Sequence, residues 1–304
     1  MLKKLFSAIT AVLLIGGMPP AWADQPGSQP KTTAEQFLAS LKFQSGKIEL
    51  PGGIATLDLP PTFRYLNPDD SNRVLVDAWG NPPGGKTLGM IFPADVSPLS
   101  EEGWGVIVTY DEDGHVKDDD ASKINYDDLL KDMKQAMDEE SKERVKAGYP
   151  ALTLVGWAEA PRYDQASHKL YWAKELASAD SKEHTLNYGI RVLGRKGVLV
   201  LNAVAGMNQI AGIRTEMQKV VAFTDFKAGN SYGDFNSSTD KVAEYGIAAL
   251  VAGGIAAKLG LFAKLFAFLL AAKKAIIVGF IALVAAIKKL LGMKKKDAAP
   301  ETGE

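Results

Sequence analysis

Residues 186–205 have the sequence LNYGIRVLGRKGVLVLNAVA, and this stretch determines the fold class. Every second position of its first half is apolar, at Leu186, Tyr188, Ile190 and Val192. A GRKG turn follows at residues 194–197, and the apolar run 198–205 returns. Period-two alternation around a glycine-containing turn predicts a β-hairpin with one face buried in a core.

A helix and further strands flank this hairpin. Strands are predicted upstream over residues 152–157, around Tyr163, and over 168–175. Downstream, residues 208–221 place apolar side chains on one helical face, at Ile210, Ile213, Met217, Val220 and Val221. An amphipathic helix next to a hairpin indicates that the helix packs on the apolar face of a sheet.

The clearest helix is predicted over residues 125–148. Asn125 can cap its N-terminus, and Gly148 with Pro150 ends it. Its apolar side chains recur at helical spacing, at Leu129, Leu130, Met133 and Met137. The other faces are densely charged, so this helix is expected to cover one side of a sheet and to face water on the other.

The N-terminal part adds a hairpin, two helices and two strands. Thr32 or Thr33 can cap a short helix, and residues 46–59 alternate around the turn PGG, which predicts a hairpin. Asn67 can cap a helix that runs to Trp79. Strands are predicted over the ranges 88–92 and 104–111.

This order of elements predicts an α+β domain. Residues 46–226 are expected to form a mainly antiparallel sheet with packed helices, after a lead-in with a short helix over residues 24–45. Residues 227–244 are polar and rich in glycine and serine, and are expected to form a linker or an ordered strap.

Residues 1–23 have the layout of a secretory signal peptide. Lys3 and Lys4 precede an apolar run, and Ala21 and Ala23 supply small residues at the positions that determine cleavage. An uncleaved N-terminal anchor is the alternative, but the run is shorter than the ~20 residues of a membrane span. We therefore expect the chain to be exported, most simply to a bacterial periplasm.

Residues 245–291 are hydrophobic, which predicts a membrane anchor of one or two transmembrane helical segments. Its glycines permit close contact between helices, and its lysines divide the stretch. The residues that we assign to the anchor are Gly246, Gly253, Gly254, Lys273, Lys274, Lys288 and Lys289. A helical hairpin around residues 273–274 and a single span by the second half both remain open. A basic and then polar tail follows over residues 292–304. The expected location is the inner membrane, with the main domain in the periplasm.

Composition excludes several kinds of site. The chain has no cysteine, which rules out disulfides, thiolate nucleophiles and Cys-ligated metals. Residues 24–244 carry 24 basic and 33 acidic residues, a net charge of −9, which argues against nucleic acid as a partner. Residues 245–304 carry 9 lysines and 3 acids, a net charge of +6, which favours contact with anionic membrane lipids.

One motif imitates a nucleotide site. Residues 80–87 are GNPPGGKT and satisfy the phosphate-binding pattern of glycine, four residues, and Gly-Lys-Thr. Two prolines remove backbone N–H donors from this loop, and a strand rather than a helix is predicted to follow it. We therefore interpret the motif as a plain loop and expect no nucleotide and no cofactor.

Acidic and histidine residues supply only weak candidates. Asp111, Asp113 and Asp118 resemble a fragment of a calcium loop, but the glutamate that completes such a loop is missing. The better interpretation is an Asp-Gly turn followed by a solvated acidic run. His115, His168 and His184 lack metal-ligand spacing, so we expect them in turns or on the surface.

Carboxylates and aromatic residues on the predicted strands give a further hypothesis. Glu159, Asp164 and Glu175 flank aromatic strands and could supply a pair for acid–base catalysis, although their spacing does not single them out. Aromatic residues that could line a binding face are Trp79, Trp104, Trp157, Trp172, Tyr163, Tyr171 and Tyr188. Packing in the core is the expected role for aromatics at such positions.

Several stretches together resemble one family. They are LPP at residues 59–61, WGNPP at 79–83, GMIFP at 89–93, GHVKDDDA at 114–121 and DKVAEYG at 240–246. The chain is similar to uncharacterised membrane-anchored proteins of Gram-negative bacteria, a domain-of-unknown-function family. The closing unit, residues 186–226, resembles the end of the PsbP/Mog1-like fold, which implies a fold and no function.

The pattern favours a non-enzymatic binding or envelope-maintenance module, because it contains no catalytic constellation and has the segments of an anchored protein. Its expected partners are membrane lipids and an unknown envelope protein or ligand. The alternatives are an envelope hydrolase that uses Glu159, Asp164 or His168, and a channel or oligomer-forming membrane component built from the glycine-rich stretch.

Overall fold

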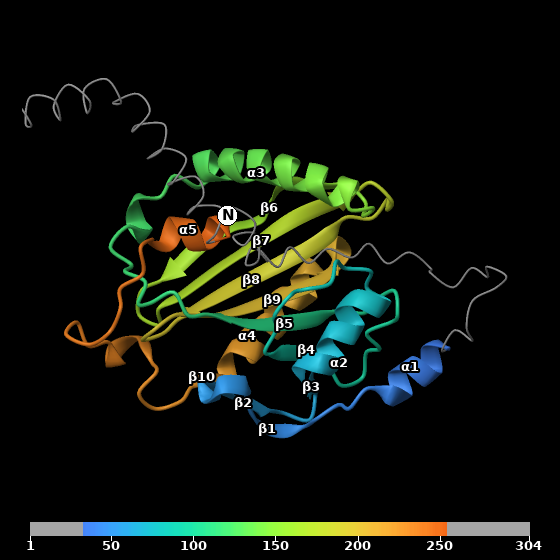
Figure 1. Cartoon of the computed structure of the whole chain (residues 1–304), viewed down its shortest axis with the longest axis horizontal. Helices are drawn as coiled ribbons and strands as arrows, with labels where there is room; N and C mark the ends of the chain where they lie inside the picture. The colour runs from blue at the N-terminus through green and yellow to red at the C-terminus, as the bar shows by residue number, and fades with distance from the viewer. Residues whose placement is uncertain (1–32, 254–304) are drawn as a thin grey trace, which may run out of the picture. The chain divides into compact units, whose positions relative to one another are not determined.

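A computed structural model of the chain describes residues 33–253 (Figure 1). Its main sheet contains β3 (Phe63–Leu66), β4 (Gly89–Pro93), β5 (Gly105–Asp111), β6 (Leu152–Asp164), β7 (Lys169–Ser178), β8 (Thr185–Leu193) and β9 (Val198–Gly206). The spatial order is β3-β4-β5-β9-β8-β7-β6, and every neighbouring pair is antiparallel. The prediction of an α+β fold with a mainly antiparallel sheet is confirmed.

The hairpin of residues 186–205 forms the middle of this sheet. β8 and β9 pair from Thr185 opposite Gly206 to Leu193 opposite Val198, and β9 pairs on its other side with β5. Gly197 in the turn lies against β5, because a Cβ there would collide with the Asp111 carbonyl oxygen. Only a residue without a side chain fits at this close approach.

One face of the main sheet is covered by α4 (Ile210–Ala222) and by a second sheet. The second sheet contains β1 (Gly46–Glu49), β2 (Ala55–Leu59) and β10 (Thr224–Phe226), in the order β1-β2-β10. β1 and β2 are the hairpin predicted over residues 46–59. The alternating apolar residues of β8 are buried in this core, together with Ile213, Met217 and Val220 of α4.

Two groups of helices cover the opposite face, as Figure 1 shows. α3 (Tyr126–Lys146) and α5 (Ile247–Ala252) pack on β6 and β7. α1 (Ala34–Ser40) and α2 (Pro68–Arg73) pack on β3, β4 and β5. The short turns are η1 (Pro51–Gly53), η2 (Val74–Ala78), η3 (Ala121–Lys123), η4 (Met207–Gln209) and η5 (Tyr232–Asp234). β8 and β9 lie between the two groups.

The helices begin at the predicted caps. Asn125 Oδ1 accepts the N–H groups of Asp127 and Asp128 at 3.1 and 3.3 Å, and Asn67 Oδ1 accepts that of Asp70 at 3.0 Å. Thr33 forms a capping box at the start of α1. These side chains satisfy backbone donors that have no partner within the helix.

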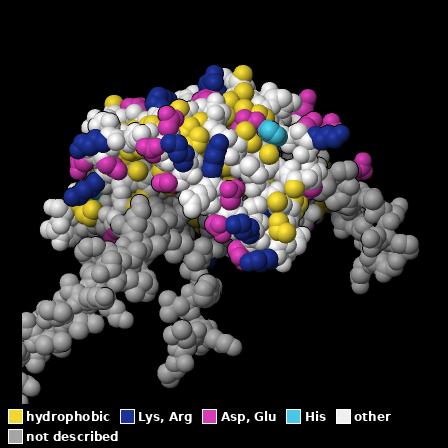
Figure 2. Space-filling model, turned by 90° about the horizontal axis from the view of Figure 1, so that it is seen from above, with side chains coloured by type: hydrophobic (Ala, Val, Ile, Leu, Met, Phe, Trp, Pro, Cys, Tyr) yellow, Lys and Arg dark blue, Asp and Glu magenta, His cyan; other side chains and the backbone are white. Residues whose placement is uncertain are grey.

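The outer surface of α3 is charged. Ion pairs one turn apart join Lys131 to Asp128, Lys142 to Glu139 and Lys146 to Glu143. Figure 2, seen from above, shows basic and acidic side chains interspersed on this side of the molecule. Because these pairs are exposed, they contribute little to stability and mainly keep the helix soluble.

β6 differs from the prediction of two strands. It is one strand of 13 residues, with irregular register against β7 between Leu154 and Gly156, between Trp157 and Glu159, and between Glu159 and Arg162. Each β-bulge adds a residue and shifts the alternation of side chains between the two faces. The period-two pattern is therefore lost within one continuous strand.

Residues 227–246 form an ordered strap rather than a flexible linker. Ser231 forms a β-bridge with Gly194, and Val242 forms one with His115. After the strap, α5 buries Ile247, Leu250 and Val251 in the core beneath α3.

The start of the predicted anchor at residue 245 therefore differs from the structure. Gly246 begins α5, and Gly253 ends it in the left-handed conformation, with φ of 98°. None of the helices within residues 33–253 has the length and apolar character of a membrane span. The predicted signal peptide and the anchor residues Gly254, Lys273, Lys274, Lys288 and Lys289 lie outside the described residues.

Two glycine substitutions test the packing around the central hairpin. We expect Gly197→Ala to lower the free energy of unfolding by about 2 kcal/mol, because its Cβ collides with the β5 backbone. Gly212→Ala is the control: it lies in α4 with nothing within 4 Å, and should raise stability by about 1 kcal/mol through helix propensity. Urea unfolding followed by circular dichroism measures both; equal effects of the two would contradict the close approach at Gly197.

Candidate functional site

Titratable side chains gather around Asp118, in the segment between β5 and α3. The hydroxyl of Tyr163 donates to Asp118 Oδ2 at 2.7 Å, and that of Tyr232 donates to Oδ1 at 3.2 Å. His168 Nδ1 lies 3.5 Å from Asp118 Oδ2 and 3.3 Å from the Tyr163 hydroxyl. Burial opposes ionisation of this carboxyl, but the two tyrosine hydrogen bonds prevail and lower the pKa of Asp118.

Four aromatic rings form a continuous stack beside this carboxylate. The ring of Phe235 lies on His115 at 4.0 Å between centroids, His115 on Tyr232 at 4.3 Å, and Tyr232 on His168 at 4.0 Å. His168 adopts φ of 51° in the turn between β6 and β7, a conformation that is uncommon outside glycine. His115 is 6% exposed, and its burial lowers the pKa of the imidazole, so the ring is neutral at pH 7.

The backbone and the acidic side chains of residues 113–120 complete the attachment of the strap. His115 N donates to Lys241 O, and Ala243 N donates to His115 O, both at 2.8 Å. The hydroxyl of Tyr245 donates to Asp113 Oδ2 at 2.8 Å, and the N–H of Ile247 donates to Asp120 Oδ1 at 3.1 Å. We call the contact between residues 113–120 and the strap the clasp.

An ion pair fixes the middle of the strap to the central hairpin. The guanidinium of Arg195, in the β8–β9 turn, donates to both carboxylate oxygens of Asp240 at 2.7 and 3.1 Å. This paired geometry is stronger and more directional than a single contact. The hydrogen bonds from Arg195, followed by that from the N–H of Asn236, lower the pKa of Asp240 to about 2.

The predicted calcium ligands do not converge. Asp113 and Asp118 accept hydroxyl groups of separate tyrosines in the clasp. The part of the chain that the structure describes contains no group of three His, Cys, Asp or Glu side chains able to hold a metal ion. Asp111, Asp113 and Asp118 therefore do not form such a site.

The predicted acid–base candidates are also apart from one another. Glu159 pairs with Arg214 of α4, whereas Asp164 accepts the Ser167 hydroxyl in the turn before β7. Glu175 Oε1 lies 2.5 Å from Nδ1 of His184 as a separate pair. Of the predicted candidates, Asp113, Asp118 and His115 belong to the clasp, and Tyr163 and His168 contact Asp118 there.

Most of the predicted aromatic residues pack in cores. Trp104, Tyr171 and Tyr188 belong to the core on the α4 face. Trp79 is buried beside α2 and donates its indole N–H to Pro98 O at 2.9 Å, and Trp157 donates to Tyr126 O at 3.3 Å. Trp172 is buried on the opposite face with its indole N–H unpaired.

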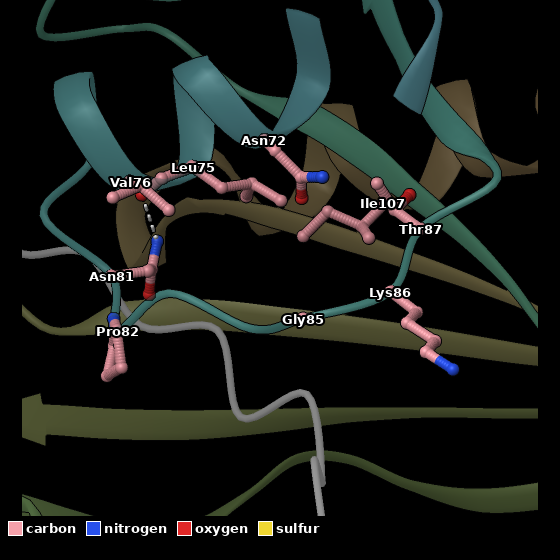
Figure 3. Close-up of a pocket in the computed structure, with 9 residues that line it drawn as sticks. All are labelled: Asn72, Leu75, Val76, Asn81, Pro82, Gly85, Lys86, Thr87 and Ile107. Atoms are coloured by element: carbon pink, nitrogen blue, oxygen red, sulfur yellow. Dashed lines mark hydrogen bonds between the residues drawn. The ribbon is translucent and has the colours of Figure 1, made fainter. Parts of the chain in front are cut away.

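A shallow hollow lies beside the GNPPGGKT loop (Figure 3). Its volume is only about 20 Å³, and it is lined by Asn72, Leu75, Val76, Asn81, Pro82, Gly85, Lys86, Thr87 and Ile107. Asn81 turns its amide to Leu75 O at 3.0 Å, and Lys86 extends away from the other lining side chains. The loop leads from helical turn η2 into β4, opposite to the strand–loop–helix order of a phosphate-binding loop.

The clasp joins segments more than 100 residues apart, which is why sequence reasoning did not predict it. Two local signals point to it in hindsight: the run GHVKDDD, which contains a histidine and three acids, and the aromatic residues within the polar stretch 226–240. Neither signal reveals its partner. The arrangement engages both oxygens of Asp118 and both faces of His115 and Tyr232, which is suited to holding the strap.

Removal of the central carboxylate should loosen the strap. In Asp118→Ala the hydroxyl of Tyr163 loses its carboxylate acceptor, and that of Tyr232 keeps only Val116 O, so we expect a loss of about 2 kcal/mol in stability. Trypsin should then cut faster at Lys227 and Lys241 in the strap. Asp119→Ala is the matched control, since this neighbour is exposed. Equal cleavage of the two variants would contradict the role of Asp118.

The Arg195–Asp240 pair should make stability depend on pH. The pKa of Asp240 is about 2 in the folded chain against an ordinary value of 3.8, so its contribution is present above about pH 4 and is lost as the pH falls towards 2. Asp240→Asn should unfold at lower urea than the wild type at pH 7, and the difference should shrink to a small part of that value near pH 2. A difference that persists unchanged at pH 2 would contradict this assignment.

Comparison with known proteins identifies a family. Residues 42–284 match the model of DUF2167, described as a protein of unknown function. No curated protein matches the chain. The predicted membership of a domain-of-unknown-function family is confirmed.

Three solved structures are similar at low identity. Cyanobacterial PsbP (CyanoP) from Synechocystis sp. PCC 6803 is 11% identical, with 66% of this chain and 99% of that chain covered and a TM-score of 0.33. A point mutant of the protein Mog1 is 10% identical, with 60% and 95% covered and a TM-score of 0.30. The Saccharomyces cerevisiae Ran-binding protein Mog1p is 11% identical, with 65% and 100% covered and a TM-score of 0.32. These matches agree with the predicted PsbP/Mog1-like resemblance, and at such scores they carry no functional argument.

Proposed function

The chain belongs to the DUF2167 family of proteins of unknown function, and on this premise we propose that it is a non-enzymatic binding or maintenance module of the cell envelope. Residues 1–23 direct its export. The hydrophobic stretch that follows residue 253 holds it at the inner membrane, with the folded domain in the periplasm.

The clasp is the observation that carries this proposal. Its titratable side chains are engaged in structural contacts: Asp118 accepts two tyrosine hydroxyls, and His115 lies between two aromatic rings. A general base needs a lone pair within reach of a substrate proton, and here the carboxylate oxygens already accept protein donors. The cluster therefore supports an attachment role.

The clasp also supports a short and rigid connection to the membrane. The ordered strap and α5 fix residues 227–252 on the domain, so no free linker separates the domain from residue 253. A flexible linker of the same 26 residues would have an end-to-end distance of roughly 25–30 Å.

The hydrolase alternative has less support. Glu159, Asp164 and His168 occupy separate surroundings in the described residues: an ion pair with Arg214, a turn before β7, and the aromatic stack of the clasp. The channel alternative depends on the hydrophobic stretch, most of which lies outside the described residues.

Truncation tests the proposed attachment. The full chain, expressed in a Gram-negative host, should sediment with membranes and lose its domain to protease added to spheroplasts. A chain that ends at Gly253 keeps the clasp and α5, and should instead be released by osmotic shock as a soluble protein. Trypsin resistance of the strap in both forms is the control for folding. Release of the full chain by osmotic shock, or retention of the truncated chain on membranes, would refute membrane attachment by this stretch.

A further inference from the structure

The face of β7, β8 and β9 that lies between α3 and α2 carries polar residues at its centre. Strand pairing places Trp172 opposite Gly189, Gly189 opposite Asn202, and Asn202 opposite Ile107 of β5. These residues form one row across four strands, and side chains in such a row point to the same side of the sheet. Lys174 and Arg191 flank the row, two positions along β7 and β8 from Trp172 and Gly189.

Trp172 has an unpaired hydrogen-bond donor. Its side chain is 2% exposed, and its indole N–H has no partner. The indole lies over Gly189, where a Cβ would stand 3.0 Å from the ring, so the missing side chain of Gly189 makes room for it. A buried N–H without a partner costs free energy, which a ligand acceptor would recover.

Lys174 and Arg191 lie on the same sheet face as this donor, and neither forms an ion pair within residues 33–253. The guanidinium of Arg191 lies 4.7 Å from the centre of the Trp172 ring. Neither Lys174 nor Arg191 has a carboxylate of residues 33–253 within 4.0 Å. Burial first, and then the charge of Arg191, lower the pKa of Lys174 to about 8, and burial lowers the pKa of Arg191 to about 10.

The other charged groups that act on Lys174 and Arg191 lie beyond ion-pair distance. Glu140 of α3 faces Lys174, and burial raises the pKa of its own carboxyl, while Arg144 one turn along α3 offsets its charge. Asp111 and Tyr245 are the groups that face Arg191 from the clasp side. Arg191 Nη1 donates to Ile190 O at 3.3 Å, but no carboxylate of the described residues pairs with either cation. Holding two largely buried cations beyond ion-pair distance of a carboxylate costs free energy, which an anionic ligand would offset.

We propose that this sheet face binds a small soluble anion through a carboxylate or phosphate group held by Lys174, Arg191 and the indole N–H of Trp172. All three groups are donors, and a guanidinium fork with an ammonium matches the oxygens of such a group. The rest of the ligand would lie along the row towards Asn202 and Ile107, and Ile107 also lines the hollow of Figure 3. The inference rests on the proposed binding role, but not on membrane attachment.

Thermal unfolding of the purified full chain in a non-ionic detergent tests the proposal. Inorganic phosphate and acetate, each in the millimolar range at constant ionic strength against chloride, serve as probes. At least one should raise the Tm of the wild type saturably, since a ligand stabilises the state that it binds. The effect should weaken as the pH rises above about 8, where Lys174 loses its proton.

Variants separate a binding role from a structural one. Lys174→Met should weaken binding of the active probe by about tenfold or more, because it removes one charged donor. Without a probe it should be at least as stable as the wild type, because a buried charge without an ion pair has been removed. Trp172→Phe keeps a ring but loses the N–H and should also bind more weakly. Lys134→Met is the control on the exposed side of α3, and should bind the probe as the wild type does.

Three results would overturn the proposal: neither probe shifts the Tm of the wild type; Lys174→Met responds to the probe as the wild type does; or Lys174→Met is less stable than the wild type without a probe. Failure here would leave the fractionation experiment unaffected, because the two measurements share no readout. Anion binding by a chain that does not sediment with membranes would support this site and refute only the proposed attachment.

Discussion

The register of β8 against β9 is the constraint on which the rest of the structure depends. Successive side chains on a strand point to opposite faces, so a shift of one residue would exchange the two faces of the central hairpin. The observed register sends Leu186, Tyr188 and Ile190 into the core beneath α4. It thereby leaves Gly189 and Arg191 on the other face. The polar face is a direct consequence of burying the apolar one.

The clasp extends the folded domain beyond the point where its last α–β unit ends. Backbone bonds at His115 and side-chain bonds at Asp113, Asp118 and Asp120 attach the strap and α5 to one short segment. The three carboxylates accept from different parts of the strap and of α5: the Tyr245 hydroxyl, the Tyr232 hydroxyl and the N–H of Ile247. The acidic run of residues 113–120 thus supplies hydrogen-bond acceptors, each of which has a donor in the strap or in α5.

Local signals predicted most of the fold, and the long-range contacts were not predictable from them. Asn67 and Asn125 predicted the starts of their helices, and the turn 194–197 predicted the central hairpin. Capping and turn formation depend on only a few neighbouring residues. The bulges in β6 erased the alternation that reveals a strand, and α5 is too short to show a period. Lys174 and Arg191 carry no local signal, since only the pairing of β7 with β8 places them on one face of the sheet, on either side of the pair Trp172–Gly189.

The sheet face and the clasp are physically adjacent, and Arg191 connects them. The groups that act on its charge from outside are Asp111, at the end of β5, and Tyr245, whose hydroxyl is fixed by Asp113 in the clasp. Arg191 and Tyr245 are half-buried, so their interaction is less screened by salt than that of Arg191 with the exposed Asp111. A change of charge beside Arg191 therefore acts on Tyr245, the strap residue that directly precedes Gly246 and α5. The residues that hold the end of the described chain thus also set the electrostatic surroundings of the polar sheet face.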